Sequence, residues 1–335
     1  MTNRLRVVAA MNSAELLHDL FSPTDLADLA EVVDLDPHVV TDVASEESIR
    51  ALASAQVLLT GWGAPRVDAT MLESAPELGW VIHTAGTVRR LVSPQLWQRG
   101  IRVSNAADAN AIPVAEYALA MVLLAAKRVL PAVAQYTHSQ AFPTWLGSRS
   151  FGNNGAVVGV VGASRTGRRL IEFLRPFDHQ VLLADPTVSA AQAQELGVEL
   201  VSLEDLLRRS AVVTLHVPLL PSTRGLIGAR ELALMAPGAT LINTARGAVV
   251  ETEALVAHLR GGRGFAVLDV TDPEPLPSGH PLFDLPEAIL TPHISGSLGN
   301  ELRRLGASAR SEVDRVRCGL PLRYEVTEQD EVFSA

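Results

Sequence analysis

Three residues that could bind and protonate an organic acid follow three successive predicted strands in the second half of the chain. The strands are expected at residues 239–244, 265–270 and 288–291, and Arg246, Glu274 and His293 come just past their ends. Ligands bind outside the carboxyl ends of strands in an open α/β sheet, so we expect these side chains to face one crevice. Beside a nicotinamide, an anion-binding guanidinium, a carboxylate and an imidazole are the groups that hydride transfer on a 2-hydroxy acid requires.

A glycine turn of the dinucleotide-binding kind precedes these strands, in a segment that reads as strand, turn and helix. Gly162 allows the tight turn, and Gly167 lets the helix approach the strand closely. The N-terminus of the helix offers N–H groups and a positive dipole end to a pyrophosphate, so Arg165 and Thr166 are expected at the cofactor. Ser164 replaces the usual middle glycine, where its Cβ would crowd the phosphate and its hydroxyl could donate to it.

Asp185 strengthens the interpretation of this turn. It ends the next predicted strand about 20 residues further on, which is the spacing of the acidic residue that accepts hydrogen bonds from the adenosine ribose. Its charge would repel a 2′-phosphate, and the neighbouring residues Pro186, Thr187 and Val188 include no arginine to bind one. The expected cofactor is therefore NAD, not NADP.

The length and composition indicate a globular protein of two domains. A chain of 335 residues is longer than one core usually sustains. The net charge of −9 argues against a nucleic-acid or anionic-membrane surface, because phosphate binding relies on clustered Lys and Arg. The one cysteine, Cys318, has no partner for a disulfide, and the histidines lack companions at ligand spacing, so no metal is expected. The N-terminus lacks a secretory signal and no apolar run reaches membrane length, so a cytoplasmic location without membrane contact is predicted.

The first hundred residues alternate short β-rich runs with amphipathic helical ones, which predicts a parallel sheet covered by helices. The expected strands are residues 6–10, 31–34, 57–61, 80–84 and 102–105, with helices around 13–20, 46–53, 67–74 and 94–99. No phosphate-binding glycine turn occurs in this half. We therefore expect it to contact the substrate, not the cofactor.

A long helical segment, apolar almost all round, is predicted from Pro113 to residue 129, with Pro113 in its first turn and Pro131 at its stop. Such a helix is expected between layers or at a subunit contact. A last helix, at residues 301–317, has too few apolar positions for a core of its own and should pack back on the first domain. The expected substrate-binding domain is therefore discontinuous, residues 1–108 and 297–335, around a cofactor domain of residues 109–296.

Several segments match one family. The chain resembles the D-isomer-specific 2-hydroxyacid dehydrogenases along nearly its whole length. The resemblance is carried by residues 105–116, 158–167, 241–247, 268–275 and 291–296. It implies an α/β fold in which a Rossmann-type, doubly wound parallel sheet binds NAD and a discontinuous flavodoxin-like domain binds substrate. It also implies a homodimer built on the helix after Pro113.

The resemblance assigns the catalytic roles. Arg246 would bind the substrate carboxylate through two parallel hydrogen bonds. His293 would exchange a proton with the carbonyl or hydroxyl oxygen, because imidazole titrates near neutrality. Glu274 would hydrogen-bond the other ring nitrogen, fix the tautomer and favour the imidazolium. Asp269 would bind the nicotinamide carboxamide. Each residue alone has an ordinary structural explanation, and their joint occurrence after a nucleotide turn supports the functional one.

Further residues are placed at the cofactor by the same resemblance: His216, Pro218, Thr244, Ala245, Ser295 and Gly296. For His216, a buried histidine at a strand end is an equally good interpretation.

Backbone N–H groups of Ala85, Gly86 and Thr87 would bind the substrate carboxylate. This loop departs from the family, since Val88 and Arg89 or Arg90 replace a second glycine and an acidic residue. An arginine turned inward would imply a second anionic group on the substrate, although a solvent-facing arginine is the simpler expectation.

The leading hypothesis is an NAD-dependent oxidoreductase that acts on a small anionic 2-oxo or 2-hydroxy acid. The formate-oxidising branch of the family has Gln where this chain has Glu274, which argues against that reaction. An NAD-sensing scaffold, similar to the corepressor-like relatives that keep the fold, is the alternative from another class. Ser164 leaves room for it, because a crowded phosphate site would bind the cofactor atypically.

Overall fold

The computed structural model describes residues 4–147 and 151–331 and divides into two compact units. Unit 1 contains the residues up to Asn110 and those from Ser297 onward, and unit 2 runs from Ala111 to Gly296. Both are α/β units built on a mostly parallel sheet, and each is described by itself.

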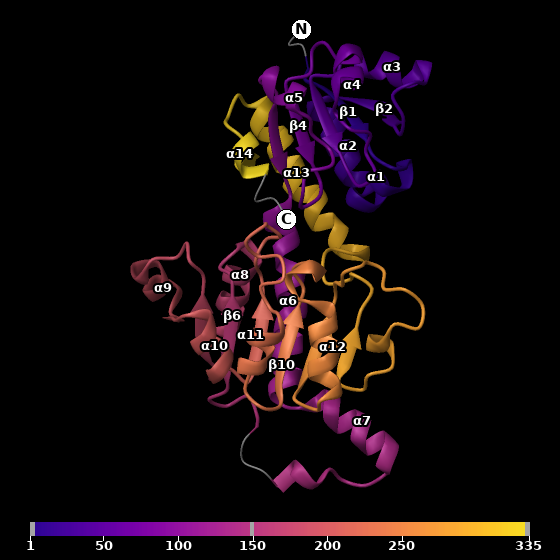
Figure 1. The fold of residues 1–335 in the computed structure, drawn as a ribbon. Coiled ribbons are helices and arrows are strands. Elements are labelled where there is room, and N and C mark those ends of the chain that lie inside the picture. Colours follow the sequence, from indigo (N-terminus) through magenta and orange to yellow (C-terminus); the bar gives the residue numbers. More distant parts are fainter. Residues whose placement is uncertain (1–3, 148–150, 332–335) are drawn as a thin grey trace. The chain divides into compact units, whose positions relative to one another are not determined.

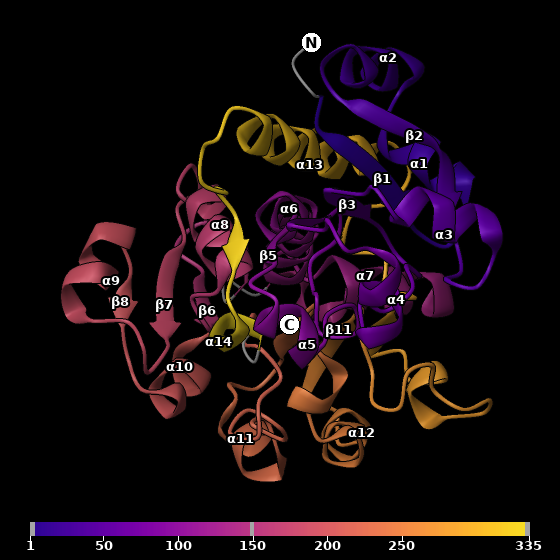
Figure 2. The same cartoon turned by 90° about the horizontal axis from the view of Figure 1, so that it is seen from above.

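The sheet of unit 1 has six strands in the order β13-β5-β4-β3-β1-β2. All pairs are parallel except β13 with β5, which is antiparallel. The order 2-1-3-4-5 of the parallel strands is that of flavodoxin, with one strand added at the edge beside β5 (Figure 2). The elements are β1 (Arg6–Ala10), α1 (Ala14–Leu20), α2 (Pro23–Val32), β2 (Asp34–Val40), α3 (Glu46–Leu52), β3 (Val57–Thr60), α4 (Ala69–Ser74), β4 (Trp80–His83), α5 (Pro94–Gln98), β5 (Arg102–Asn105), η4 (Gly299–Glu301), α13 (Leu302–Arg317), β13 (Glu325–Val326) and α14 (Glu328–Glu331).

Helices cover both faces of this sheet. Buried side chains of α3, α4 and α5 pack on one face, and those of α1, α2 and α13 pack on the other. Gly306 of α13 allows a close approach, since a Cβ there would lie 2.0 Å from the backbone oxygen of Leu20. The C-terminal helix therefore completes the core of the unit that begins at the N-terminus.

The strand expected at residues 31–34 is wrong. Residues Pro23–Val32 form α2, which begins at Ser22 with a capping box to Asp25 and has Pro23 in its first turn. The strand β2 follows at Asp34–Val40 and contains Pro37. A proline cannot donate to a neighbouring strand, and it is tolerated here because β2 is at the edge of the sheet.

The sheet of unit 2 has seven strands in the order β12-β11-β10-β9-β6-β7-β8, all parallel. Read from β6, this is the Rossmann order 3-2-1-4-5-6 with one further strand, so the order reverses between β6 and β9. The elements are α6 (Ala107–Ala126), α7 (Val129–Ser139), η1 (Thr144–Gly147), β6 (Val157–Val161), α8 (Arg165–Leu174), β7 (Gln180–Ala184), α9 (Ala190–Leu196), β8 (Glu199–Leu200), α10 (Leu203–Arg209), β9 (Val212–Leu215), α11 (Ala229–Leu234), β10 (Ala239–Asn243), η2 (Gly247–Val249), α12 (Thr252–Arg260), β11 (Gly264–Leu268), η3 (Pro281–Phe283) and β12 (Ala288–Leu290).

This sheet is also covered on both faces (Figure 1). Side chains of α10, α11 and α12 pack on one face, and those of α6 and α8 pack on the other. Gly159 in β6 allows α10 to approach, since a Cβ at this position would lie 2.3 Å from Leu206. The strands that end at the predicted site are thus rigidly packed.

The long apolar helix differs from its prediction. It begins at Ala107, so Pro113 lies inside it, and it ends at Ala126. The side chain of Asn105 accepts a hydrogen bond from the N–H of Ala107 at 3.2 Å and so supports the early start. Pro131 does not stop a helix but lies in the first turn of α7, where its missing N–H costs nothing. Among the described residues, α6 has the length and composition to cross a membrane, but a core helix passes the same test, and seven of its side chains are buried.

Candidate active site

The turn after β6 has the geometry that a pyrophosphate needs. Gly162 has φ +95°, and a Cβ on it would lie 2.7 Å from Val217 and 2.9 Å from the backbone of His216. A Cβ at Gly167 would lie 2.1 Å from the oxygen of Gly162. Neither position accepts a side chain, so the backbone of the turn stays open at the N-terminus of α8.

Ser164 is the N-cap of α8. Its φ of −62° is allowed for any residue, so the missing glycine costs the backbone nothing. Its hydroxyl accepts a hydrogen bond from the N–H of Gly167 at 3.3 Å. One of the free N–H groups at this helix end is therefore already paired with the protein.

Asp185 follows β7 and ties two loops together. Its Oδ2 accepts from the N–H of Ala163 at 2.7 Å, and its Oδ1 accepts from the hydroxyl of Thr187 at 2.6 Å. Burial acts to raise the pKa of Asp185, but these hydrogen bonds and the charge of Arg168 outweigh burial and leave the pKa below its ordinary value. The carboxylate is thus ionised beside the glycine turn.

His216 and Thr244, which follow the neighbouring strands β9 and β10, are both buried but differ in their hydrogen bonds. His216, after β9, is buried with its Nε2 2.9 Å from the hydroxyl of Thr214, and burial lowers its pKa to about 4. It is therefore a neutral histidine under the glycine turn. Thr244, after β10, is 8% exposed, and its hydroxyl has no hydrogen-bond partner. An unpaired buried hydroxyl is costly, so a ligand at this strand end would satisfy it.

Arg246 lies in a turn that its own neighbours define. The side chain of Asn243 donates to the carbonyl of Arg246 at 2.9 Å and accepts from the N–H of Ala245 at 3.0 Å. Gly247 then packs against the next strand end, since a Cβ there would lie 1.9 Å from the carbonyl carbon of Thr271. Arg246 is partly buried, and its turn lies against the segment that leads to Glu274.

His293 and Glu274 form the expected pair. The Nδ1 atom of His293 lies 2.8 Å from Oε1 of Glu274, and the two side chains are 52% and 42% exposed. Because Glu274 occupies Nδ1, the Nε2 atom is left for a reacting group. Arg246 follows β10 and His293 follows β12, and β11 lies between these two strands, so all three predicted residues are at one edge of the sheet.

The backbone of His293 is in the left-handed region, with φ +55°. This conformation is uncommon outside glycine and costs about 1 kcal/mol or more, so neighbouring groups must stabilise it. The N–H of His293 donates to the carbonyls of Asp269 and Thr291, both at 3.0 Å. The turn that carries the imidazole is therefore wound around the end of β11.

The carboxylate of Asp269 is the centre of this turn and is 1% exposed. Its Oδ1 accepts from the hydroxyl of Thr291 at 2.6 Å and from the N–H of Ile294 at 2.8 Å, and its Oδ2 accepts from the N–H of Ser295 at 2.9 Å. A carboxylate has about four acceptor positions, so Oδ2 retains one. One more donor, such as a carboxamide, fits here.

The predicted substrate loop belongs to unit 1. It follows β4, and Asn105 donates to the carbonyl of Gly86 at 3.0 Å. Ala85 is buried, whereas Gly86 is partly buried and Thr87 is exposed. Val88 is fully buried in the core, and Arg89 and Arg90 are both exposed, as the simpler expectation has it.

A buried histidine supports this loop. The Nδ1 atom of His83 lies 2.9 Å from the hydroxyl of Thr60. Burial lowers the pKa of His83 to about 4, although hydrogen bonds with the backbone of Thr87 and Thr60 act in the other direction. This neutral imidazole connects the end of β3 to the loop.

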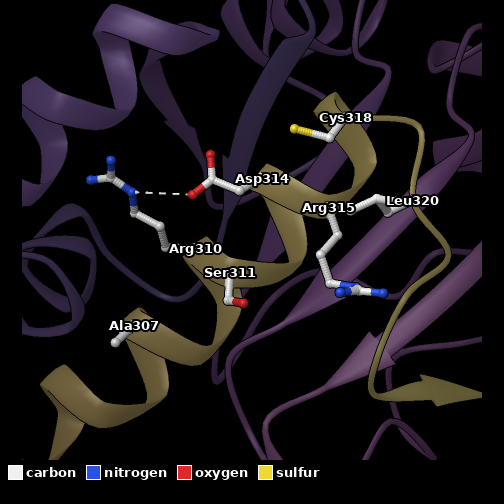
Figure 3. Close-up of a pocket in the computed structure, with 7 residues that line it drawn as sticks. All are labelled: Ala307, Arg310, Ser311, Asp314, Arg315, Cys318 and Leu320. Carbon is white, nitrogen blue, oxygen red and sulfur yellow. Dashed lines mark ion pairs between the residues drawn. The ribbon is translucent and has the colours of Figure 1, made fainter.

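One cavity of unit 1 lies elsewhere, along α13 (Figure 3). It has a volume of about 410 Å³ and is lined by Ala307, Arg310, Ser311, Asp314, Arg315, Cys318 and Leu320. None of the predicted site residues lines it, and its charged groups are already engaged, since Arg310 lies 3.8 Å from Asp314 and Arg315 donates to the carbonyl of Pro321. In the described part of the chain, no group of three or more His, Cys, Asp or Glu could bind a metal ion.

Four residues of the site were missed by sequence reasoning: Asn243, Gly247, Thr291 and Tyr117. Tyr117 of α6 is partly buried, with its hydroxyl 2.8 Å from that of Thr291. Burial raises the pKa of Tyr117, and the nearby Asp269 adds to this. Asn243 and Gly247 lie next to Arg246, and an asparagine and a glycine that flank a strand-end arginine are a turn signal that could have found them.

Comparisons with known proteins identify the family of the chain. Residues 119–295 match the family described as D-isomer specific 2-hydroxyacid dehydrogenase, NAD binding domain. The chain is 35% identical over 301 residues to D-3-phosphoglycerate dehydrogenase from Mycobacterium tuberculosis, which covers 89% of this chain and 56% of that protein. It is 34% identical over 263 residues to glyoxylate reductase from Thermococcus litoralis, 77% of this chain and 78% of that protein. The chain therefore spans about half the length of the phosphoglycerate dehydrogenases it matches.

Solved structures show the same fold. The TT0316 protein from Thermus thermophilus is 31% identical with a TM-score of 0.71, and the alignment covers 96% of this chain and all of that one. A phosphoglycerate oxidoreductase from Rhizobium etli is 25% identical with a TM-score of 0.81, over 97% and 99% of the two chains.

The cofactor can now be stated. The glycine cradle of Gly162 and Gly167, the ionised Asp185 and the unpaired hydroxyl of Thr244 fit a dinucleotide at the edge where the strand order reverses. This segment matches an NAD-binding domain, so NAD is the cofactor. Taken with the relatives, this match means that the chain belongs to the D-isomer specific 2-hydroxyacid dehydrogenase family.

Proposed function

We propose that this protein is an NAD-dependent oxidoreductase that interconverts a small 2-oxo acid and its D-2-hydroxy acid. The observation that carries the proposal is the contact of 2.8 Å between His293 and Glu274, at the same edge of the sheet as Arg246 and the glycine turn after β6. When bound, NAD supplies the acceptor or donor of the hydride. The remaining chemistry belongs to side chains of unit 2.

His293 moves the proton. Its Nε2 would give a proton to the carbonyl oxygen during reduction and take one from the hydroxyl during oxidation. Glu274 accepts from Nδ1, so it orients the ring and fixes which ring nitrogen faces the substrate. The pair is half exposed, which allows the proton to be exchanged with water between turnovers.

Arg246 binds the substrate carboxylate. A planar guanidinium makes two parallel hydrogen bonds to a carboxylate, which aligns the neighbouring carbonyl carbon with the cofactor. The two hydrogen bonds of Asn243 to the backbone of Ala245 and Arg246 support this role, because they fix the backbone from which the arginine side chain extends. The N–H groups of Ala85, Gly86 and Thr87 are proposed as the second carboxylate contact.

The proposed cofactor contacts follow the same edge. Gly162, Ser164, Arg165, Thr166 and Gly167 would surround the pyrophosphate at the N-terminus of α8, and Asp185 would accept from the adenosine ribose. The free acceptor position of Asp269 would bind the carboxamide. The remaining proposed contacts are His216, Pro218, Thr244, Ala245, Ser295 and Gly296.

We also propose a homodimer through the region of α6 and α7. Much of α6 is buried inside unit 2, whereas α7 and the segment after it expose apolar side chains. These are Val133, Tyr136, Phe142 and Leu146. An exposed apolar group of this kind is typical of a surface that a second subunit covers.

The test is an assay with NADH and a panel of 2-oxo acids: glyoxylate, hydroxypyruvate, pyruvate, and branched and aromatic ones. We expect turnover on at least one acid, a loss of roughly a thousandfold or more in His293→Ala, and a similar loss in Arg246→Ala, because each removes a group that acts in the transition state. Arg246→Lys keeps the charge but not the two parallel bonds and should recover little. NADH binding without turnover on any acid would instead support the scaffold.

A further inference from the structure

The hydrogen bonds behind the imidazole form a directed chain. The carboxylate of Asp269 can only accept, so the hydroxyl of Thr291 donates its single proton to Oδ1 at 2.6 Å. The hydroxyl of Tyr117, 2.8 Å from Thr291, must then be the donor to Thr291. Both directions follow because the carboxylate oxygen accepts and each hydroxyl has a single proton to donate.

These hydrogen bonds lead from Tyr117 through Thr291 and Asp269 to the turn that carries His293. Asp269 accepts from the N–H groups of Ile294 and Ser295, which follow His293, and its carbonyl accepts from the N–H of His293 itself. Three successive N–H groups are thus paired with one residue, and the first belongs to a backbone with φ +55°. Asp269 can stabilise this backbone conformation of His293 only while its own side chain is held in place.

Thr291 and Tyr117 are the side chains that maintain it. Thr291 follows β12 directly, and Tyr117 comes from the middle of α6, which packs on the sheet of unit 2. Without the hydroxyl of Thr291, Oδ1 would keep one of its two hydrogen bonds, in a residue that is 1% exposed. A buried carboxylate that loses a hydrogen-bond donor moves to find another one. The N–H groups of Ile294 and Ser295, which donate to it, would move as well.

We propose that Tyr117 and Thr291 are positioning residues that hold His293 in its turn by fixing the carboxylate of Asp269. The role of His293 in the reaction rests on the proposed function, but the positioning does not. The contacts of both hydroxyls lead to Asp269 and not to His293 itself. Their effect reaches the imidazole through three backbone N–H groups.

The experiment compares Thr291→Val, Thr291→Ser and Tyr117→Phe with the natural chain. Val has the shape of Thr without the hydroxyl, and Ser retains the hydroxyl. Two matched controls remove similar hydroxyls elsewhere: Thr240→Val, from a buried position in β10, and Tyr324→Phe, in unit 1. The main readout is hydrogen exchange of the backbone amides of Ile294 and Ser295, which needs neither substrate nor cofactor.

We expect these amides to exchange about tenfold faster in Thr291→Val and about threefold faster in Tyr117→Phe, with the amides of β9 unchanged. Thr291→Ser should restore the natural rate. In the assay, kcat should fall by about tenfold in Thr291→Val, while KM for the acid changes by less than about twofold, because a displaced base slows the chemical step more than binding.

Natural exchange rates at Ile294 and Ser295 in Thr291→Val would overturn the proposal, and so would a Thr291→Ser variant as fast as Thr291→Val. If Thr291→Val does not fold, Tyr117→Phe decides by the same measurement. If the natural chain turns over none of the acids, the proposed function fails while the exchange rates still decide whether the turn is positioned in this way.

Discussion

The Oδ2 atom of Asp185 accepts a hydrogen bond from the N–H of Ala163 at 2.7 Å, so the residue expected at the adenosine ribose also braces the glycine turn. One carboxylate therefore connects the ends of β6 and β7, the first two strands of the cofactor unit. Its consequence for cofactor choice can be tested by substitution.

Asp185→Ala should narrow the preference for NADH over NADPH by roughly tenfold, because it removes a charge that repels a 2′-phosphate. The measurement is kcat/KM with each cofactor at a saturating 2-oxo acid. Asp185→Asn keeps a hydrogen-bonding group near the turn without the charge, and Glu195→Ala, an exposed acid on α9, serves as the control. An unchanged preference in Asp185→Ala would remove this residue from its assigned role.

Ser164→Gly should bind NADH more tightly, by about two- to fivefold, because it removes a Cβ from the pyrophosphate site and frees the N–H of Gly167. The loss of the cap to glycine should cost only a few tenths of a kcal/mol, whereas Ser164→Ala should cost about 1 kcal/mol. Fluorescence titration of NADH and urea unfolding measure the two effects. Weaker binding in Ser164→Gly would mean that the hydroxyl contacts the phosphate directly.

Acid should destabilise unit 1 through His83. Burial lowers its folded pKa to about 4, while the unfolded chain takes up the proton near the ordinary value of about 6.5. Between these values the unfolded state binds more protons, so stability is complete above about pH 7 and falls as the pH drops toward 4. From pH 7.5 to 5.5, the free energy of unfolding should fall by about 1.4 kcal/mol through this residue.

Urea unfolding followed by tryptophan fluorescence measures this, since Trp62, Trp80 and Trp97 all belong to unit 1. In His83→Gln this part of the pH dependence should disappear. His18→Gln changes an exposed histidine of the same unit and should keep the dependence of the natural chain. Identical pH slopes for the natural chain and His83→Gln would contradict the assignment.

Gly247→Ala should abolish most of the activity and cost about 3 kcal/mol of stability, because the added methyl would meet the backbone of Thr271 at 1.9 Å. The turn of Arg246 and the segment leading to Glu274 would be forced apart. Gly79→Ala is the control, since its Cβ would meet nothing closer than 3.9 Å. Thermal unfolding and kcat/KM report the two effects, and a fully active Gly247→Ala would show that this contact does not position the arginine.

The double substitution Val133→Asp and Phe142→Asp should convert the proposed dimer to a monomer of 35.7 kDa. It places charges among the exposed apolar side chains of α7 and the segment after it. Light scattering after size-exclusion chromatography measures the mass. Ile49→Asp introduces a charge at an isolated exposed position of unit 1 and should leave the mass unchanged. A natural chain that is already monomeric would end the proposal.

The strand-end residues could be predicted because their signals are local. A glycine turn, an acid after the next strand and a Pro-His pair after an apolar run each have a short spacing that reflects one βα unit. Asp269 was named only through the family resemblance, since the strand expected at residues 265–270 contains it. The sequence therefore contained the cofactor turn and the residues expected to react.

What could not be predicted depends on contacts between distant segments. Tyr117 and Thr291 are 174 residues apart in the sequence, and only the packing of α6 on the sheet brings their hydroxyls together. The strand misplaced at residues 31–34 failed for a local reason, because the apolar run continued a helix already capped at Ser22. Pro113 misled because a proline is tolerated inside a helix when the turns on both sides are well packed.

The edge strand β13 is made last, and this affects how the chain folds during synthesis. Unit 2 is one uninterrupted stretch, whereas unit 1 receives its edge strand and α13 only after residue 296. During synthesis, the dinucleotide unit can complete its sheet first, while the edge of β5 remains open to pairing with another chain. Newly made protein should therefore aggregate through the edge of β5. A chain truncated before Glu325 should aggregate more, while the folding of unit 2 should be unaffected.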